Sequence, residues 1–250
     1  MSPRPSTEDA LGRKAREQRE RETLLLSIAR RLLVEQGYLG LTMDKIAAAS
    51  EYSKGTVYQH FPNKEDVIAA LVIETGDERA RIFERAATFR GRSRERMAAI
   101  GVAEELFVRL QPMHWESSKM IDSASIRAKT SESRQKAMLA CEMRCTEIVT
   151  GIVRDAIAQG DLQLETEDTP ESLTFGLWSM AFGAHMLAEM EDDLRHKGYG
   201  PIASMTQRNY RILLDGYGWH PLSSAWDYDE TQERIQRELF GEELRTLAQG

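Results

Sequence analysis

Apolar positions near the start of the chain repeat with the period of an α-helix. From about Glu17 to Gln36 they fall on one face, and Gly37 follows as a natural C-terminal cap. The apolar face consists of Leu25, Ile28, Ala29, Leu32 and Leu33. We therefore expect a helix over residues 17–36 that contributes this face to a core.

Residues 42–61, TMDKIAAASEYSKGTVYQHF, predict two short helices joined by a tight turn. Thr42 is suited to cap the first helix and Ser53 the second. Phe61 precedes Pro62, and a residue before proline disfavours the helical region. The segment therefore predicts a helix-turn-helix.

A further helix is expected from Asn63, as its cap, to about Phe89. Gly76 falls in its middle, either as a compliant point or kink or as a tolerated exposed glycine.

The rest of the chain continues as helices separated by proline and glycine breaks. We expect them at about residues 93–110, 113–129, 131–159, 169–193 and 202–217, with an amphipathic segment from Ser223 to Gly250. Because alternation of β-branched residues is scarce, the fold class predicted is all-α.

The segment 169–193 is apolar over most of its circumference. One stripe contains Leu173, Leu177, Met180, Ala184 and Leu187, and another contains Phe175, Trp178, Phe182 and Met186. A helix of this kind must be buried on two sides.

Charge is distributed unevenly along the 250 residues, whose formal net charge is −7. Residues 1–66 hold 11 Lys and Arg against 10 Asp and Glu, a net charge of +1, which leaves −8 for the remainder. The hydrophobic content of 41% supports a substantial core. A basic face on an acidic body is sufficient for phosphate binding, because local potential governs it.

Other compositional features favour a cytoplasmic protein. Two cysteines indicate a reducing compartment rather than a disulfide scaffold. The N-terminal residues are polar and charged, unlike a signal peptide, and no apolar run approaches the ~20 residues of a membrane span.

We find no sequence constellation for an enzyme, a cofactor or a metal site. A glycine-rich phosphate loop, a His-Glu-x-x-His motif and zinc-ribbon cysteine pairs are all missing from the sequence. Cys141 and Cys145 share a helical face, which is compatible with a redox switch or soft-metal site and with ordinary core positions.

The helix-turn-helix and its flanks resemble the DNA-binding domain of the TetR family of bacterial transcription regulators. The matching words are GYLGLTMDKIAAAS at residues 37–50 and YSKGTVYQHFPNKEDVI at residues 52–68. Glu51 departs from the pattern, because many members have glycine at this turn position. A non-glycine residue with positive φ costs about 1 kcal/mol, so we expect a slightly strained turn.

The resemblance implies a DNA-binding surface on the two short helices. Thr42, Tyr58 and Lys64 would bind phosphate, and Lys54, Thr56, Gln59 and Met43 would face bases. Gly55 would permit close approach, and His60 would serve either role. Residues 1–16, with several basic side chains, would be either a disordered tail or an arm that reaches a minor groove.

The resemblance also implies a domain order. A flexible basic arm (1–16) and a helix-turn-helix domain (17–66) would precede a ligand-binding and dimerisation domain (67–221) and an extra C-terminal helix (222–250). In the family the corresponding helices line an effector cavity. The aromatic and Met side chains on them are core residues or favour a mostly apolar ligand, with His114 or His185 as a polar contact. The expected lining residues of the cavity are Phe107, Trp115, Met138, Trp178 and Phe182.

The function implied is a homodimeric, ligand-responsive repressor of a palindromic DNA operator. The helices at 169–193 and 202–217 would pair across a two-fold axis, with Leu177 as a candidate central position. Two alternatives remain: a transcriptional activator of the same fold, and a helical sensor without DNA binding.

Overall fold

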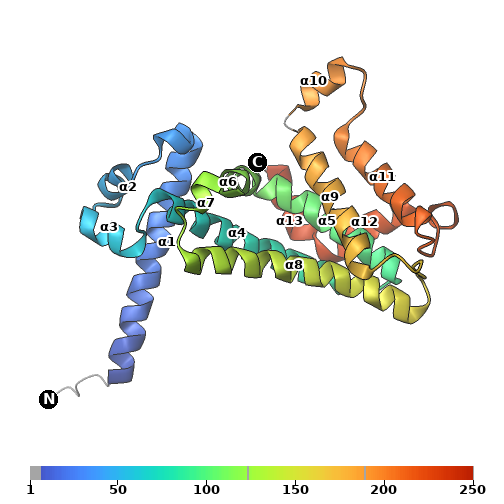
Figure 1. Cartoon of the computed structure of the whole chain (residues 1–250), viewed down its shortest axis with the longest axis horizontal. Coiled ribbons are helices and arrows are strands. Elements are labelled where there is room, and N and C mark those ends of the chain that lie inside the picture. Colours follow the sequence, from blue (N-terminus) through green and yellow to red (C-terminus); the bar gives the residue numbers. More distant parts are fainter. Residues whose placement is uncertain (1–6, 123, 189, 250) are drawn as a thin grey trace. The chain divides into compact units, whose positions relative to one another are not determined.

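The computed structural model describes residues 7–122, 124–188 and 190–249, and excludes the side chains of residues 7–11, 115, 116, 119, 122, 124 and 125. All regular elements within these residues are helices, which confirms the all-α fold class (Figure 1). The first elements are α1 (Thr7–Gly40), α2 (Met43–Ser50), α3 (Lys54–His60), α4 (Lys64–Ala87), α5 (Ser93–Leu110), α6 (Pro112–Asp122) and α7 (Ala124–Arg127). They are followed by α8 (Glu132–Gln159), α9 (Pro170–Ala188), α10 (Glu191–His196), α11 (Ile202–Gly216), the short η1 (Ser223–Ala225), α12 (Tyr228–Leu239) and α13 (Gly241–Gln249).

The chain divides into two compact units. Unit 1 consists of Met1–Asp77 with Gln111–Cys141, and unit 2 consists of Glu78–Leu110 with Glu142–Gly250. The long helices α4 and α8 each contribute residues to both units. These units are defined by compactness and do not test the functional domain boundaries expected at residues 16, 66 and 221, which stay predictions.

Unit 1 has its core around the C-terminal half of α1. The apolar face predicted for this helix is buried together with Ile46 of α2 and Val57 of α3. Ile121 and Met138 join the same core from α6 and α8. The helix-turn-helix is therefore part of a larger helical unit.

The first helix begins ten residues earlier than expected. Residues 7–16 of the expected flexible arm are helical in α1, and residues 1–6 lie outside the described part of the chain. Arg13, Glu17 and Arg21 follow one another at four-residue spacing, and this arrangement favours a helix. Gly37 has φ 66° and ψ −177°, so the regular helix is interrupted at the predicted cap.

Three expected helices are divided in the structure. Residues 113–129, expected as one helix, form α6 and α7. The helix expected to reach residue 193 ends at Ala188, before α10. The C-terminal extension forms α12 and α13, which are separated at Phe240. Helix α13 begins with Gly241, a residue of low helix propensity.

Gly76 is buried where α4 and α8 approach each other within unit 1. A Cβ atom at this position would lie 3.3 Å from the Cβ of Cys141. The interpretation of Gly76 as an exposed glycine is therefore wrong, because a side chain here would press on the neighbouring helix.

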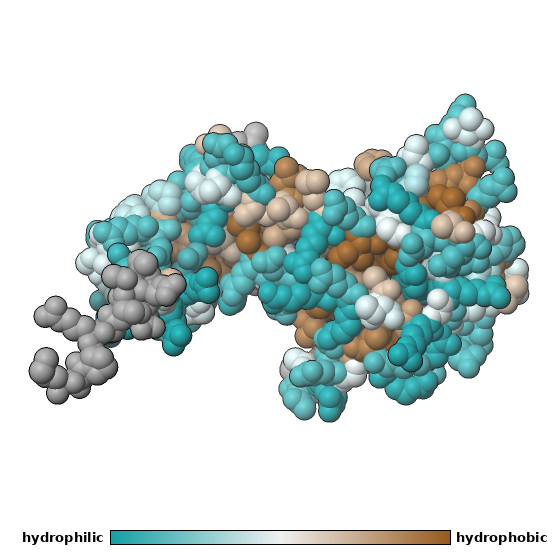
Figure 2. Space-filling model, turned by 90° about the horizontal axis from the view of Figure 1, so that it is seen from below, coloured by the Kyte–Doolittle hydropathy of each residue, from teal (hydrophilic) through white to brown (hydrophobic). Residues whose placement is uncertain are grey.

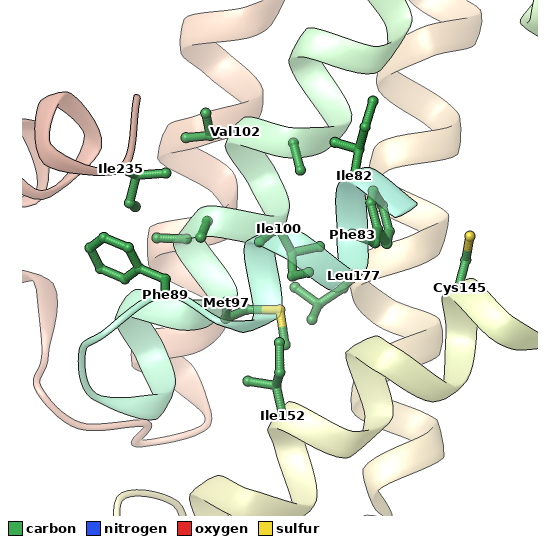
Figure 3. Close-up of a cluster of buried hydrophobic side chains, with 14 of the residues drawn as sticks. Ile82, Phe83, Phe89, Met97, Ile100, Val102, Cys145, Ile152, Leu177 and Ile235 are labelled. Atoms are coloured by element: carbon green, nitrogen blue, oxygen red, sulfur yellow. The ribbon is translucent and has the colours of Figure 1, made fainter. Parts of the chain in front are cut away.

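Unit 2 has a separate core. Figure 3 shows Ile82, Phe83, Met97, Ile100 and Ile152 gathered from the end of α4, from α5 and from α8. Leu177 of α9 and Ile235 of α12 complete the cluster.

The C-terminal extension packs on its own chain. Helices α12 and α13 both pack on α5, and the side chain of Phe240 is completely buried. The guanidinium of Arg85 lies 5.0 Å from the centre of the Phe240 ring and pairs with Glu243. The extension therefore closes part of the core of unit 2.

Candidate nucleic-acid interface

The caps predicted for the helix-turn-helix are present. The hydroxyl of Thr42 accepts a hydrogen bond from the Lys45 amide at 3.3 Å, and that of Ser53 accepts one from the Thr56 amide at 3.1 Å. Each hydroxyl satisfies a backbone donor that has no partner inside the first helical turn.

The turn between α2 and α3 is strained as expected. Glu51 has φ 60° and ψ 10°, and it is the one non-glycine residue with positive φ among those described. The neighbouring Ser50 hydroxyl donates to Ala47 O at 3.1 Å and accepts from the Tyr52 amide at 3.3 Å. These bonds stabilise a turn that glycine would adopt at lower cost.

Helix α3 presents one face to the core and the other to solvent. Val57 and the following Phe61 are completely buried, and they attach the helix to unit 1. The opposite face exposes four of the predicted DNA-binding positions, which are Lys54, Gly55, Tyr58 and Gln59. A Cβ atom added to Gly55 would meet only Ser53 Oγ, at 3.8 Å, so another molecule has room to approach closely.

Two polar side chains of α3 are held by neighbours. Lys54 Nζ lies 2.8 Å from Asp44 Oδ2, and this hydrogen bond and charge raise the pKa of the Lys54 amine. Both groups are well exposed, so the pair is readily exchanged for another partner. The hydroxyls of Thr56 and Ser53 are 2.9 Å apart, and Thr56 is half-buried.

Three further predicted DNA-binding residues differ in how far they are buried. Met43 is only 8% exposed and belongs to the core of unit 1. Lys64 is half-buried; its Nζ donates to Tyr38 O at 3.2 Å and lies 3.9 Å from the centre of the Tyr38 ring. Thr42, which directly precedes Met43, is exposed, and its hydroxyl caps α2.

A polar groove of about 510 Å³ lies between the end of α3 and the N-terminal half of α1. Gln59 and His60 form one wall. The other wall consists of Arg13, Lys14, Glu17, Gln18 and Arg21. The sequence placed Arg13 and Lys14 in a basic arm and Arg21 on the polar side of the next helix, but it did not predict that these residues face α3, because no local sequence signal gives that direction.

The residues expected to line an effector cavity are divided between the two units. Phe107 is buried in the core of unit 2, and Met138 is buried in the core of unit 1. The side chain of Trp115 lies outside the described part of the structure. Trp178 and Phe182 do lie together, with ring centres 5.8 Å apart, but they are 54% and 38% exposed on α9. Their role in ligand binding stays a prediction.

The two histidines expected as polar contacts have hydrogen-bonding partners in the structure. His114 Nδ1 contacts the hydroxyl of Thr75 within unit 1, and its Nε2 is 3.5 Å from Ser118 Oγ. His185 belongs to unit 2, where its Nε2 is 3.2 Å from Glu104 Oε1.

Glu104 is the centre of a charged cluster that sequence reasoning missed. Its carboxylate accepts two hydrogen bonds from Arg79, from Nε at 2.8 Å and from Nη2 at 2.9 Å. Burial alone would raise the pKa of Glu104, but the charge of Arg79 and hydrogen bonds from His185 and Arg79 lower this pKa to about 2. The sequence alone does not single out this pair, because α4 and α5 each carry several other charged residues.

The cysteines are both free thiols. Burial raises the pKa of the Cys145 thiol, which disfavours the reactive thiolate. The Sγ of Cys141 lies 3.6 Å from Asp77 Oδ1. Among the residues whose positions are described, no group of three or more His, Cys, Asp or Glu side chains is arranged to hold a metal ion. Within the same residues, no helix has both the length and the apolar character needed to cross a membrane.

Comparison with known proteins identifies the N-terminal region. Residues 25–71 match the family model for bacterial regulatory proteins of the tetR family. An uncharacterized HTH-type transcriptional regulator of Mycobacterium tuberculosis is 48% identical over 54 residues, which are 22% of this chain and 27% of the relative. Another from Bacillus subtilis is 40% identical over 55 residues, again 22% of this chain and 28% of the relative. The chain thus matches about a quarter of the length of these curated relatives.

Solved structures extend the similarity to the fold of the larger part of the chain. A TetR/AcrR family regulator from Thermobifida fusca has a TM-score of 0.57 at 24% identity, covering 79% of this chain and 98% of its own. The regulator FadR of Bacillus subtilis, solved with stearoyl-CoA, has a TM-score of 0.58 at 15% identity, covering 78% of this chain and 98% of its own.

The relatives that carry a functional name are named as regulators. The matched residues include both caps, the strained turn and the whole of α3. The helix-turn-helix region, residues 25–71, therefore belongs to the TetR family of bacterial transcription regulators.

Proposed function

We propose that the chain is a homodimeric, ligand-responsive repressor that binds a palindromic DNA operator through α3. The observation that carries the proposal is the solvent face of α3, where Lys54, Tyr58 and Gln59 project beside Gly55 while Val57 anchors the helix. A short helix with exposed donors and acceptors fits a major groove, whose base edges carry a distinct pattern for each base pair.

In this proposal Lys54, Thr56 and Gln59 meet base edges, while Thr42, Tyr58 and Lys64 meet phosphates. His60 serves one or the other, and Met43 acts through the core because it is buried. Two-fold symmetry of a dimer requires half-sites about 34 to 36 Å apart, or a multiple of that spacing. Such a regulator acts in the cytoplasm, where bacterial DNA is found.

Dimerisation through α9 and α11 is supported by exposed apolar side chains on these packed helices. Phe175 is 61% exposed and Trp178 is 54% exposed, and their rings contact each other at 5.8 Å. Ile212 of α11 is exposed as well. From the side shown in Figure 2, brown hydrophobic patches interrupt the teal hydrophilic surface. Apolar surface of this kind is typical of protein–protein contacts.

Leu177 is not at this surface, although the sequence suggested it as a central interface position. It is only 7% exposed and lies in the core of unit 2. Trp178, its neighbour in the sequence, is the better position for a test of dimerisation.

The effector in this proposal is a small, mostly apolar molecule that binds within the second domain. The support is the apolar interior of unit 2, together with the complex of the similar B. subtilis FadR with stearoyl-CoA. The helices α4 and α8 supply residues to both units, so they are suited to couple ligand binding to the position of α3.

Selection from a random pool of duplex DNA tests the proposed function. The wild-type chain should enrich an inverted repeat with one half-site for each subunit. Enrichment of no sequence, or of an asymmetric site bound by a monomer, would contradict the proposal. Transcription from promoters that carry the selected site should rise in a deletion strain, whereas a fall would favour the activator alternative.

Titration of stearoyl-CoA with and without the selected duplex tests ligand response. A coupling of about 1 to 3 kcal/mol changes operator affinity by about 5- to 150-fold, and DNA must weaken ligand binding by the same factor. Equal acyl-CoA affinity in both titrations would exclude this ligand class as the regulator.

A further inference from the structure

Residues 12–20 of α1 are exposed on all faces of the helix. The first completely buried side chain of the helix is Leu25. Residues 13–21 carry five basic side chains, Arg13, Lys14, Arg16, Arg19 and Arg21, against the two acids Glu17 and Glu20. A helix that is polar on every face is not stabilised by packing against a core, and this stretch of basic side chains suits a charged partner.

This stretch faces the end of α3 across the polar groove described above. Arg13, Lys14 and Arg21 line it opposite Gln59 and His60. Every lining side chain except Glu17 is able to donate a hydrogen bond. The groove therefore suits a ligand with several acidic oxygen acceptors, such as a phosphodiester chain.

Glu17 is the one acid in the groove, and it lies between two arginines. Its carboxylate is 4.0 Å from Arg13 Nε and 3.7 Å from Arg21 Nη2. The exposed fractions of these side chains are 50% for Glu17, 71% for Arg13 and 45% for Arg21, so the pairs are weak. Both arginines are thus able to turn to a phosphate without losing much stability.

We propose that this groove binds the sugar-phosphate backbone of duplex DNA that flanks the base pairs met by α3. The proposal rests on the proposed function and deepens it, because it extends the contacted DNA beyond the helix-turn-helix. The sugar-phosphate backbone supplies closely spaced anionic oxygens, and each cation that neutralises one phosphate steepens the salt dependence of binding by about 0.9. Arg13, Lys14 and Arg21 together account for a slope contribution of about −2.7.

Matched charge changes test this contact in the full-length chain. The probes are the duplex selected by the wild-type protein and the same duplex extended on each side by half a helical turn, about 5 base pairs. Lys14→Gln should lower the salt slope by about 1, and Arg13→Gln combined with Lys14→Gln should lower it by about 2. Lys136→Gln, at an exposed lysine of α8, is the control and should leave the slope unchanged.

Glu17→Gln provides a test in the opposite direction. Removal of the acid should strengthen DNA binding, whereas a purely structural role of this helix would not produce a gain. Glu132→Gln, at the exposed partner of Lys136, is the matched control and should have no effect. The extended duplex should bind the wild type more tightly than the short one, and the double variant should lose this difference.

The outcomes separate this inference from the proposed function. Wild type that binds no duplex refutes both. A second outcome is that DNA affinity depends on Lys54, while Lys14→Gln has the salt slope of the wild type and Glu17→Gln binds DNA no more tightly. This outcome refutes the groove contact alone.

Discussion

Replacement of Trp178 by Glu should dissociate the dimer without unfolding the subunit. The side chain is half-exposed in the isolated chain, between Phe175 and Phe182 on the same face of α9. In a dimer through this face, the introduced carboxylate would be buried without a partner, next to its symmetry-related copy. Such a charge costs about 3 to 5 kcal/mol.

The magnitude follows from the exposed aromatic area. The three side chains are 61%, 54% and 38% exposed, which at roughly 200 Å² for each gives about 300 Å² per subunit. Burial of about 600 Å² in the dimer contributes about 15 kcal/mol before other terms, against an association cost of about 4 to 15 kcal/mol. With so small a margin, the buried charge should raise the dissociation constant by about 10²- to 10⁴-fold.

Sedimentation velocity over a range of concentrations measures this change, with circular dichroism to show that the helices remain. Leu177→Glu is the informative comparison, because Leu177 is in the core and its variant should lose thermal stability. Leu39→Glu, at an apolar side chain that is 87% exposed on α1, is the control and should remain dimeric. An unchanged dissociation constant for Trp178→Glu, or a monomeric wild type at micromolar concentration, would refute the reasoning.

Substitutions at three other positions test local features. Glu51→Gly should stabilise the chain by up to about 1 kcal/mol, because it relieves a positive φ, and urea unfolding should show Glu51→Val to be less stable than wild type. Asp44→Asn frees the Lys54 amine and removes a negative charge, so fluorescence anisotropy should show tighter binding to mixed-sequence duplex; unchanged binding would place Lys54 away from DNA. Glu104 has a folded pKa of about 2, below its ordinary value of 4.5, so its stabilisation is present above about pH 4.5 and is lost as the pH falls through 2. Between pH 4.5 and 2 the free energy of unfolding should fall by about 3 kcal/mol more in the wild type than in Glu104→Gln. If this free energy depends on pH in the same way in both proteins, the charge cluster does not stabilise the fold.

The helix-turn-helix was predictable because its signals are local. The caps Thr42 and Ser53, and the turn at Glu51, depend on residues within a few positions of each other. The start of α1 was missed because its first turns are charged and carry no boundary signal. The pattern of hydrophobic positions predicts a helix, but it does not predict which residues pack against each face of that helix.

That limitation explains the other differences. The burial of Met43 and the close approach at Gly76 depend on which helices meet in three dimensions. On α9, apolar character alone did not separate the core residue Leu177 from the exposed Trp178. The charged cluster around Glu104 was missed for the same reason, since its partner Arg79 is 25 residues away in the sequence.

Reading of DNA by α3 is the central claim, and paired affinity measurements of one variant test it most directly. Gln59→Ala should be compared with wild type on the selected duplex, on single base-pair variants of it and on mixed-sequence duplex. Loss of a specific contact should relax preference at one base position, at a cost of about 1 to 3 kcal/mol, and leave affinity for mixed-sequence DNA nearly unchanged. An equal loss of affinity for selected and mixed-sequence duplex would contradict the claim that Gln59 reads a base.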